Sequence, residues 1–403
     1  MPVKFRVYSI VLLLLLSSLL LLVQASRGFA WDYSINWTAS LALRNGISLY
    51  DRNALRELGV QTVGPVMSRL FDDPFTSYIG LPTTAMLLLP FTAWTFPVSL
   101  LIYRIVALLA FICGATIVGF VLPEKLRPTA WTTGGLCLII WHSIVFSLEL
   151  GQVDAWIVLV LAISVLAIQY KWWRLAGICI GVAALLKISP GLLLIYCVLK
   201  RQWSVVRSAT LTVCIGLGLS LLPNQGADLT RFVFYIAPAL GGGSIHVQNQ
   251  ALGAWLARLV SHDPHFLSFT IAIGIWRYVG LLIALGLLLI LWWIRRRNLL
   301  SAIDFSVVII IALIAGPITW DHYTSWAIIP VMLLMPYLYR RRRMLFILFL
   351  ILLAFPVLYL TPEAIAAAWW TRIITGTQTI SLLGMVLISF LVLQDESKPQ
   401  TSS

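Results

Sequence analysis

Long apolar runs are the feature that most limits what this chain can fold into. A bilayer has a hydrocarbon core about 30 Å thick and needs roughly 20 apolar residues per helix. Twelve runs are candidate spans, several of them short enough to be partial or broken helices: residues 7–25, 98–121, 129–148, 153–169, 174–187, 188–199, 204–222, 268–294, 302–319, 323–339, 344–360 and 374–393. The chain is 60% hydrophobic and only 11% charged, whereas soluble domains are about 45–50% apolar and about 25% charged. The sequence therefore predicts an all-α, polytopic transmembrane bundle of about twelve spans.

Short basic clusters between the apolar runs predict the orientation. Lys and Arg in short loops remain on the cytoplasmic side of a membrane. If the N-terminus is inside and the chain crosses twelve times, every cluster falls on that side: Lys4/Arg6, Lys125/Arg127, Lys171/Arg174, Lys200/Arg201/Arg207, Arg295–Arg297 and Arg340–Arg343. We expect a multi-pass plasma-membrane protein with both termini in the cytoplasm. The net charge of +13 then reflects topology, and no nucleic-acid partner is predicted.

The runs and loops indicate one integral-membrane domain over residues 1–394, followed by a polar tail, 395–403, that is expected to be disordered. Two long segments, 26–97 and 223–267, are predicted to lie on the extracytoplasmic side, and the first should contain interfacial or re-entrant helices.

Two segments allow alternatives. Residues 80–96 are apolar but short and contain Pro82 and Pro90. We interpret them as an interfacial or re-entrant helix, since a full span there would place the later basic clusters outside. Residues 1–25 also have the charge, apolar run and small-residue end of a secretory signal peptide. Cleavage there would disturb the even number of spans.

Ionisable residues are concentrated on the predicted outer side. Of the 15 acidic residues, 11 fall there, and all five histidines lie on or near that side. Asp32, in the segment WDYSINW, is a candidate general base, with a helix-capping carboxylate as the alternative. Lys187 ends an apolar run, and a lysine within a membrane segment costs about 2.5–3.5 kcal/mol on insertion scales. It is a candidate phosphate ligand, unless it only snorkels to the headgroups.

Three further segments carry polar groups on that side. His322, after the helix break at Gly316 and Pro317, offers acid–base chemistry or is simply an interfacial histidine. Gln152 can orient a sugar hydroxyl or belong only to a hairpin turn. The three-glycine run at 241–243 precedes a group of polar candidates that could bind substrate on a mobile flap: His246, Asn249 and Arg258.

Other cofactor chemistry has no support in the sequence. The five cysteines lie within apolar stretches, so no disulfide framework is expected. No metal-ligand spacing and no nucleotide-binding glycine motif is present, so no cofactor is predicted, and a divalent metal remains an unsupported possibility. A sugar donor would therefore have to come from the membrane.

Six motifs, taken in order, resemble glycosyltransferase family 87, the C-type membrane transferases that include polyprenol-phosphate-mannose-dependent mannosyltransferases. They are W-D-Y at 31–33, A-L-R-N-G-I-S-L-Y-D at 42–51, G-Q-V-D at 151–154, A-G-I-C-I-G-V-A-A-L-L-K-I-S-P at 176–190, N-Q-A-L-G with A-R-L in 249–259, and W-D-H-Y at 320–323. In that family an Asn is usual where this chain has Asp154.

The resemblance implies transfer of a hexose, with mannose expected, from a polyprenyl-phosphate donor to a lipid or glycan acceptor. Transfer would take place on the extracytoplasmic face with inversion. Asp32 and His322 would be catalytic residues. The substrate-binding residues would be Lys187, Gln152, Asn249, Arg258, His246 and Tyr50. The rival prediction is a twelve-span transporter or lipid flippase, although no repeat of two halves is evident.

Overall fold

The computed structural model describes residues 29–71, 77–261, 268–269, 271–341, 344 and 369–397. Within these residues all regular elements are helical, and the one extended pairing is an isolated bridge between Asn249 and Trp320. Two predicted spans, 7–25 and 344–360, lie outside the described residues, except for residue 344. The tail from residue 398 onward also lies outside them. Residues 395–397, predicted to be disordered, instead continue the last helix.

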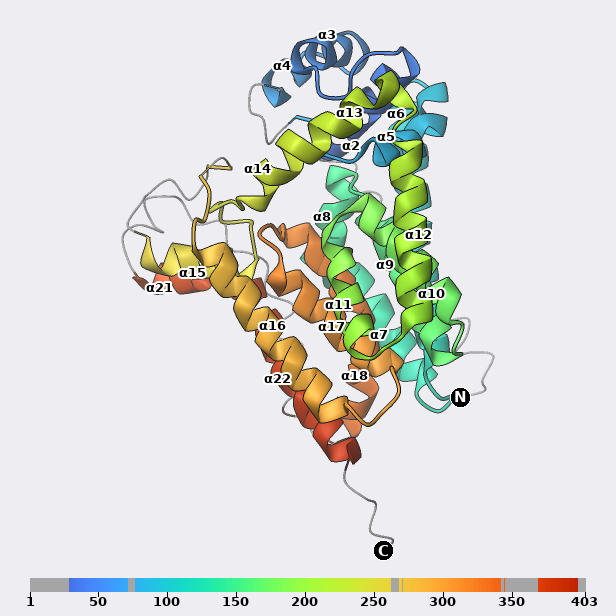
Figure 1. The fold of residues 1–403 in the computed structure, drawn as a ribbon, viewed down its shortest axis with the longest axis vertical. Helices are drawn as coiled ribbons and strands as arrows, with labels where there is room; N and C mark the ends of the chain where they lie inside the picture. Colours follow the sequence, from blue (N-terminus) through green and yellow to red (C-terminus); the bar gives the residue numbers. More distant parts are fainter. Residues whose placement is uncertain are drawn as a thin grey trace, which may run out of the picture.

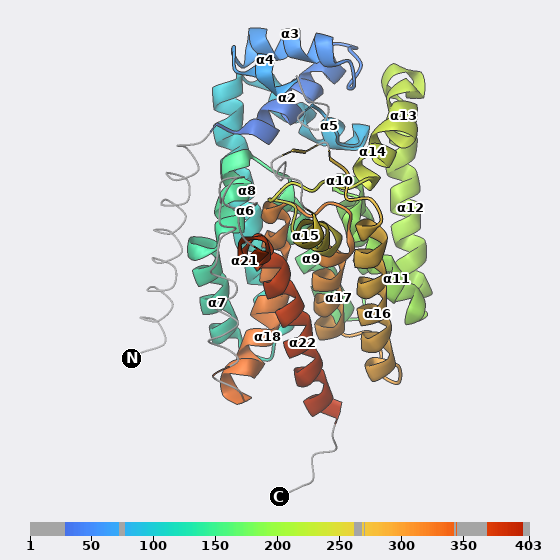
Figure 2. The ribbon, with the colours of Figure 1, turned by 90° about the vertical axis from the view of Figure 1, so that its left-hand side faces the viewer.

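The molecule is an elongated helical bundle with a smaller helical cap at one end (Figures 1 and 2). The bundle contains α6 (Phe96–Val121), α7 (Arg127–Ile140), α8 (His142–Leu150), α9 (Asp154–Gln169), α10 (Trp173–Leu186), η2 (Ser189–Leu192), α11 (Leu193–Leu199), α12 (Trp203–Leu219), α16 (Trp276–Arg295), α17 (Ala302–Ala315), η5 (Asp321–Ala327), α18 (Ile328–Arg341) and α22 (Thr377–Ser397). The cap contains α2 (Trp31–Arg44), α3 (Arg52–Thr62), α4 (Met67–Leu70), α5 (Pro82–Leu88), η1 (Leu89–Ala93), η3 (Pro223–Gly226), α13 (Ala227–Arg231), the π-helix η4 (Phe232–Ile236) and α14 (Ala237–Gly241). Two short helices, α15 (Leu252–Val260) and α21 (Trp369–Ile374), lie to one side of the bundle.

The described helices only partly match the predicted spans. By length and composition, two of them, α6 and α16, could each cross a membrane alone. The pair α7 and α8 is bent by 56°, and α12 is bent by 112° against the η3–α14 segment; counting each bent pair as one span gives up to four. The remaining apolar helices of the described part have 10–17 residues. The number of about twelve spans is therefore not established.

Residues 80–96 form α5 and η1, which lie against α2 in the cap. Pro82 occupies the first turn of α5, where its missing N–H costs nothing, and Pro90 begins the tighter η1 turn. Side chains of α2 hold this segment: Trp37 Nε1 donates to the carbonyl of Phe91 at 3.2 Å, and Arg44 donates to that of Thr92 at 3.1 Å.

Close helix packing shapes the bundle. Helices α10 and α12 meet through Gly177 and Gly181, which are four residues apart on one face of α10. A Cβ atom at Gly181 would lie 2.8 Å from the carbonyl oxygen of Ala209, and one at Gly177 would collide with Val205 and Ser208. Small residues at this spacing let two backbones approach closely within a membrane.

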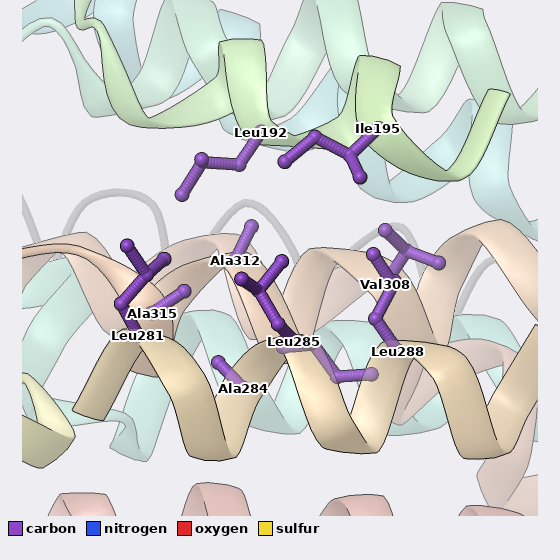
Figure 3. A pocket seen from close by; sticks show the side chains of 10 residues that line it. Leu192, Ile195, Leu281, Ala284, Leu285, Leu288, Val308, Ala312 and Ala315 are labelled. Atoms are coloured by element: carbon purple, nitrogen blue, oxygen red, sulfur yellow. The ribbon is translucent and has the colours of Figure 1, made fainter. Parts of the chain in front are cut away.

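A small gap remains between α11 and the α16–α17 pair. Figure 3 shows Leu192 and Ile195 on one side, facing leucine, alanine and valine side chains on the other. Its volume is about 20 Å³ and its lining is entirely aliphatic. A space of this size without polar groups stays dry, so it is a packing gap.

Candidate functional site

A buried carboxylate, Asp154, is the centre of the candidate site. It begins α9, directly after the turn at Gly151, and its side chain is fully buried. Gly151 has φ +70°, and a Cβ atom there would lie 2.5 Å from Cβ of Tyr33, so only glycine fits this turn. The turn delivers Asp154 and Gln152 to the interior between α2, α8 and α9.

Asp154 joins three segments of the chain. Its Oδ1 accepts hydrogen bonds from Lys187 Nζ and from Trp326 Nε1, both at 2.8 Å. Its Oδ2 lies 3.8 Å from Nε2 of His322. A buried carboxylate is tolerated only when it is paired and hydrogen-bonded, and this one has both a cation and an indole donor.

Lys187 is presented by a break in the helices. Helix α10 ends at Leu186, Lys187 is extended, and η2 begins at Ser189. The ammonium group lies between the carboxylate of Asp154 and the ring of Tyr323, 3.5 Å from the ring centroid. The carboxylate and the ring face both stabilise its positive charge.

Asp32 faces this group from the first turn of α2. Gln152 hydrogen-bonds its carboxylate, and it interacts electrostatically with Lys187 and Asp154. Burial is the main reason that the pKa of Asp32 is raised to about 6, while Gln152 and Lys187 act in the opposite direction. The backbone carbonyl of Gln152 accepts a hydrogen bond from Tyr103 at 2.9 Å, which fixes this turn. Asp32 is thus mainly ionised at neutral pH, with a pKa near that of a useful base.

His322 supplies a neutral imidazole. Burial and the positive charge of Lys187 lower its pKa well below the usual value. Neither ring nitrogen has a hydrogen-bond partner among the described residues; Nδ1 lies 3.7 Å from Asp321 Oδ1. The ring packs against Tyr323 and Phe146. A neutral imidazole can donate one hydrogen bond and accept another.

Two of the residues expected to bind substrate, Asn249 and Arg258, make hydrogen bonds that connect loops. Asn249 donates to the carbonyls of Ser244 and Pro317 and accepts from Thr319 N, so both ends of its amide are used. Arg258 is buried and donates to backbone carbonyls, including that of His246, and to Thr375 Oγ1. Burial lowers the pKa of Arg258 to about 9.

The two other residues of this prediction, His246 and Tyr50, also contact their local surroundings. His246 stacks on Phe269, with the ring centroids 4.0 Å apart, and its pKa is lowered to about 4, mainly by burial. Tyr50 lies in the cap and donates to the carbonyl of Gly80 at 2.7 Å. The structure therefore brings together Asp32, Gln152, Lys187 and His322. Among the contacts of the described residues, none joins the remaining four to Asp154.

Sequence reasoning did not select Asp154, Tyr323 or Trp326 as site residues, although Asp154 belongs to the G-Q-V-D motif and Tyr323 to the W-D-H-Y motif. The signal for Asp154 was available, because a lysine at membrane depth requires a partner and Asp154 is a neighbouring acidic residue. Trp326, four residues after His322, gave no separate signal. Within the described residues, no group of three or more His, Cys, Asp or Glu side chains is arranged to hold a metal ion.

The family model described as Glycosyltransferase family 87 matches residues 78–317, more than half of the chain. The chain belongs to glycosyltransferase family 87. The prediction from the motifs is thereby confirmed. The matched region contains Gln152, Asp154 and Lys187, whereas Asp32 and His322 lie outside it.

The curated relatives match this chain over only part of their length. A polyprenol-phosphate-mannose-dependent alpha-(1-2)-phosphatidylinositol pentamannoside mannosyltransferase from Mycolicibacterium smegmatis is 29% identical over 209 residues, 50% of this chain and 46% of that protein. A protein of the same name from Mycobacterium tuberculosis is 25% identical over 257 residues, 60% of this chain and 56% of that protein. The chain spans about half the length of these curated relatives.

Among solved structures, the fold is similar to that of ArnT from Cupriavidus metallidurans, crystallised with undecaprenyl phosphate. The TM-score is 0.52 at 14% sequence identity, and the match covers 98% of this chain and 78% of that one. At this identity the similarity concerns the fold alone. The family match and the apolar helices α6 and α16 identify this chain as an integral membrane protein.

Proposed function

We propose that this chain transfers the hexose mannose from a polyprenyl-phosphate donor to a hydroxyl group of a lipid or glycan acceptor. The transfer takes place on the extracytoplasmic face of the membrane. The observation that carries the proposal is the meeting of Asp32, Lys187 and His322 around Asp154 in one buried site. The mycobacterial relatives are named for polyprenol-phosphate-mannose as donor and for phosphatidylinositol mannosides. Those names support the donor and sugar class.

Asp32 acts as the general base. Its carboxylate removes the proton of the acceptor hydroxyl as that oxygen forms a bond to the anomeric carbon. The bond from that carbon to the phosphate oxygen breaks, and its electron pair leaves with the polyprenyl phosphate. Attack opposite the leaving group inverts the anomeric centre. Gln152 orients the carboxylate through its hydrogen bond.

Lys187 stabilises the leaving phosphate. One of its three N–H donors is used by Asp154, and the other two can bind phosphate oxygens. Asp154 favours the charged ammonium in a buried place where a lysine alone would lose its proton. Negative charge grows on the phosphate as the bond breaks, so a fixed cation stabilises the transition state more than the ground state. His322, being neutral, hydrogen-bonds a sugar or acceptor hydroxyl.

The test is transfer by the purified protein in liposomes with a synthetic polyprenyl-phosphate hexose and a membrane-lipid extract as acceptor. Release of polyprenyl phosphate and the mass of the new glycoside are measured together. Asp32→Asn should lower the transfer rate by about 10²–10⁴-fold, the usual contribution of a general base. Glu57→Gln, an exposed carboxylate in α3, is the matched control and should leave the rate unchanged.

Near-normal transfer by the Asp32→Asn protein would remove Asp32 from the role of base. Movement of intact donor across the bilayer, without release of polyprenyl phosphate, would contradict transfer and favour a flippase.

A further inference from the structure

A second cavity lies in the cap, between the start of α3 and the η3–α13–η4 segment. Its volume is about 770 Å³, within the roughly 300–1,000 Å³ of typical small-molecule sites. Arg52 enters from α3 and Arg231 from α13. Asn224 and Gln225 line it from η3. None of these four residues belongs to the candidate catalytic site.

The walls of this cavity are held in place by one buried carboxylate. Asp228 accepts hydrogen bonds from Ser48 Oγ at 2.6 Å, from Leu49 N at 3.3 Å and from Asn224 Nδ2 at 2.8 Å. These contacts tie the segment before α3 to α13, 180 residues later, and tie α13 to η3. The cavity is thus built by specific contacts between the two long segments predicted to be extracytoplasmic.

Two adjacent residues in the wall adopt an unusual backbone. Asn224 has φ +46° and Gln225 has φ +53°, values that residues with side chains rarely adopt. Residues held in such conformations cluster at binding sites, where the surrounding structure keeps them in place. Here the conformation places two neighbouring amide side chains at the cavity, and each amide can both donate to and accept from a hydroxyl.

The cavity favours an anion. Arg52 and Arg231 are exposed, and neither makes a hydrogen bond or ion pair with the described residues. No acidic residue is among the described residues that line it. A guanidinium group binds phosphate oxygens through two parallel N–H donors, so two arginines suit a phosphate diester.

The surface beside the cavity is apolar. Helix α12 ends at Leu219, and the chain then turns by 112°. Leu222, Phe234 and Tyr235 are about 70% exposed after this turn. Aromatic and aliphatic side chains that are exposed at the end of an apolar helix are typical of the bilayer surface. This surface suits the apolar chains of a lipid whose headgroup occupies the cavity.

We propose that this cavity binds the headgroup of an anionic glycolipid, and that this lipid is the acceptor. Arg52 and Arg231 hold the phosphate, while Asn224 and Gln225 bind sugar hydroxyls. The lipid chains lie against the apolar surface at Leu222 and Phe234. The acceptor role rests on the proposed transferase function; the binding site itself does not.

The cavity is connected to the candidate catalytic site through the cap. Tyr50, which lines the cavity, donates to the carbonyl of Gly80 at 2.7 Å, just before α5. Thr84 of α5 donates to the carbonyl of Leu185 at 3.4 Å, and Lys187 is two residues further on. The segment from Gly80 to Thr84 thus lies between a residue that lines the cavity and the helix that ends just before Lys187.

The binding test uses the detergent-purified full chain and dioctanoyl phosphatidylinositol as the probe. The Arg52→Ala/Arg231→Ala protein should bind this lipid at least tenfold more weakly than the unchanged protein. Arg174→Ala, an exposed arginine far from the cap at the start of α10, is the control and should bind normally. Asp32→Asn should also bind normally, so this result does not depend on catalysis.

Three outcomes would overturn the proposal. The double variant could bind the lipid as tightly as the unchanged protein does. The unchanged protein could bind dioctanoyl phosphatidylglycerol, which has no sugar ring, or inorganic phosphate as tightly as it binds dioctanoyl phosphatidylinositol.

In the transfer assay, the Arg52→Ala/Arg231→Ala protein should have a KM for a phosphatidylinositol-based acceptor that is at least tenfold higher, with kcat and the donor KM unchanged. A change in kcat alone would contradict an acceptor site. If no transfer occurs with any acceptor, the binding result still decides the site.

Discussion

The side chain of Asp154 connects several helices of the bundle to the candidate site. It receives Trp326 from η5 and Lys187 from the end of α10, while Asp32 approaches from α2. Two carboxylates therefore share one lysine. Asp154 has the direct contact with the ammonium, whereas the carboxylate of Asp32 is hydrogen-bonded by the neutral amide of Gln152. In the proposed mechanism this arrangement leaves Asp32, and not Asp154, to act as the base.

The pH dependence of transfer should follow Asp32. Its pKa of about 6 means that roughly nine-tenths of the carboxylate is ionised at pH 7 and roughly one-tenth at pH 5. Because only the ionised form accepts a proton, kcat should fall about tenfold for each unit below pH 6 and level off above pH 7. The measurement is initial rate against pH at saturating donor. A rate that stays constant down to pH 4.5 would be incompatible with Asp32 as the base.

The Asp154→Asn variant should distinguish the support that Asp154 gives to Lys187 from the action of Asp32 as the base. The amide keeps the shape but removes the charge that favours the ammonium, so phosphate stabilisation should be lost. We expect kcat to fall at least tenfold while the position of the acid limb moves by less than one pH unit. Rates at several pH values measure this. The matched control is Asp304→Asn, which breaks the distant buried pair with Arg295 and should lower stability without a selective loss of kcat. A normal kcat in Asp154→Asn would refute the supporting role.

For single residues, the sequence indicated candidate site residues where an ionisable side chain stands alone in an apolar chain. Asp32, Lys187 and His322 could be selected because each is costly there without a partner or a function. Asn249 and Arg258 were selected because they follow the glycine run, yet they donate mainly to backbone carbonyls of their own loop and its neighbours. Partners of that kind depend on the path of the backbone, which spacing along the sequence does not reveal.

Helix α10 shows how an element positions the site. Its glycine face lets α12 approach closely, and its end presents Lys187 to Asp154. Part of the sequence match to family 87 therefore has a structural explanation, since Gly177 lies ten residues before Lys187 in the same motif. The glycine allows the packing that fixes where the lysine points.

Gly177→Ala should destabilise the protein, while Gly218→Ala should not. A Cβ atom at Gly177 meets backbone and side chain of α12, whereas at Gly218 nothing lies within 4 Å. We expect a loss of roughly 1–3 kcal/mol for the first, as in other overpacked sites, and a gain of up to about 1 kcal/mol for the second. Thermal unfolding in detergent measures both. Equal melting temperatures for the two variants would show that the α10–α12 contact is more adaptable than described.

Element boundaries were less predictable than element identity. Residues 129–148 predict one span, but the structure has α7 and α8 with a 56° bend at Trp141. No Pro or Gly marks this position. Helix α8 has extensive contacts with η5, which contributes His322 to the site. Tertiary packing of this kind overrides a continuous apolar run.

The candidate site lies at the end of the bundle that carries the cap (Figure 2), because Asp32 belongs to α2 of the cap and interacts with Gln152 and Lys187. The fold class and the family could be predicted from apolar runs and scattered motifs. The number of spans could not, because helices of 14 to 16 residues such as α9, α10 and α17 are too short to be counted by length alone.

Sidedness can be tested with single cysteines. Asn53 in α3 and Asn298 after α16 are exposed and belong to opposite ends of the bundle. In a chain whose five native cysteines are replaced by alanine, a membrane-impermeant maleimide should label Asn53→Cys in intact cells. It should label Asn298→Cys only after the membrane is opened. The reverse pattern would place the candidate site in the cytoplasm and contradict the proposed function.

The contact between Ser48 and Asp228 has a consequence for biosynthesis. A ribosome adds roughly 5–20 residues per second, so about 10 to 40 s pass between synthesis of the first partner and of the second, 180 residues later. In the proposed topology, the α2–α4 region leaves the translocon during that interval without the residues that complete it. Helper proteins outside the membrane would therefore meet this region first, while the rest of the chain is still being made.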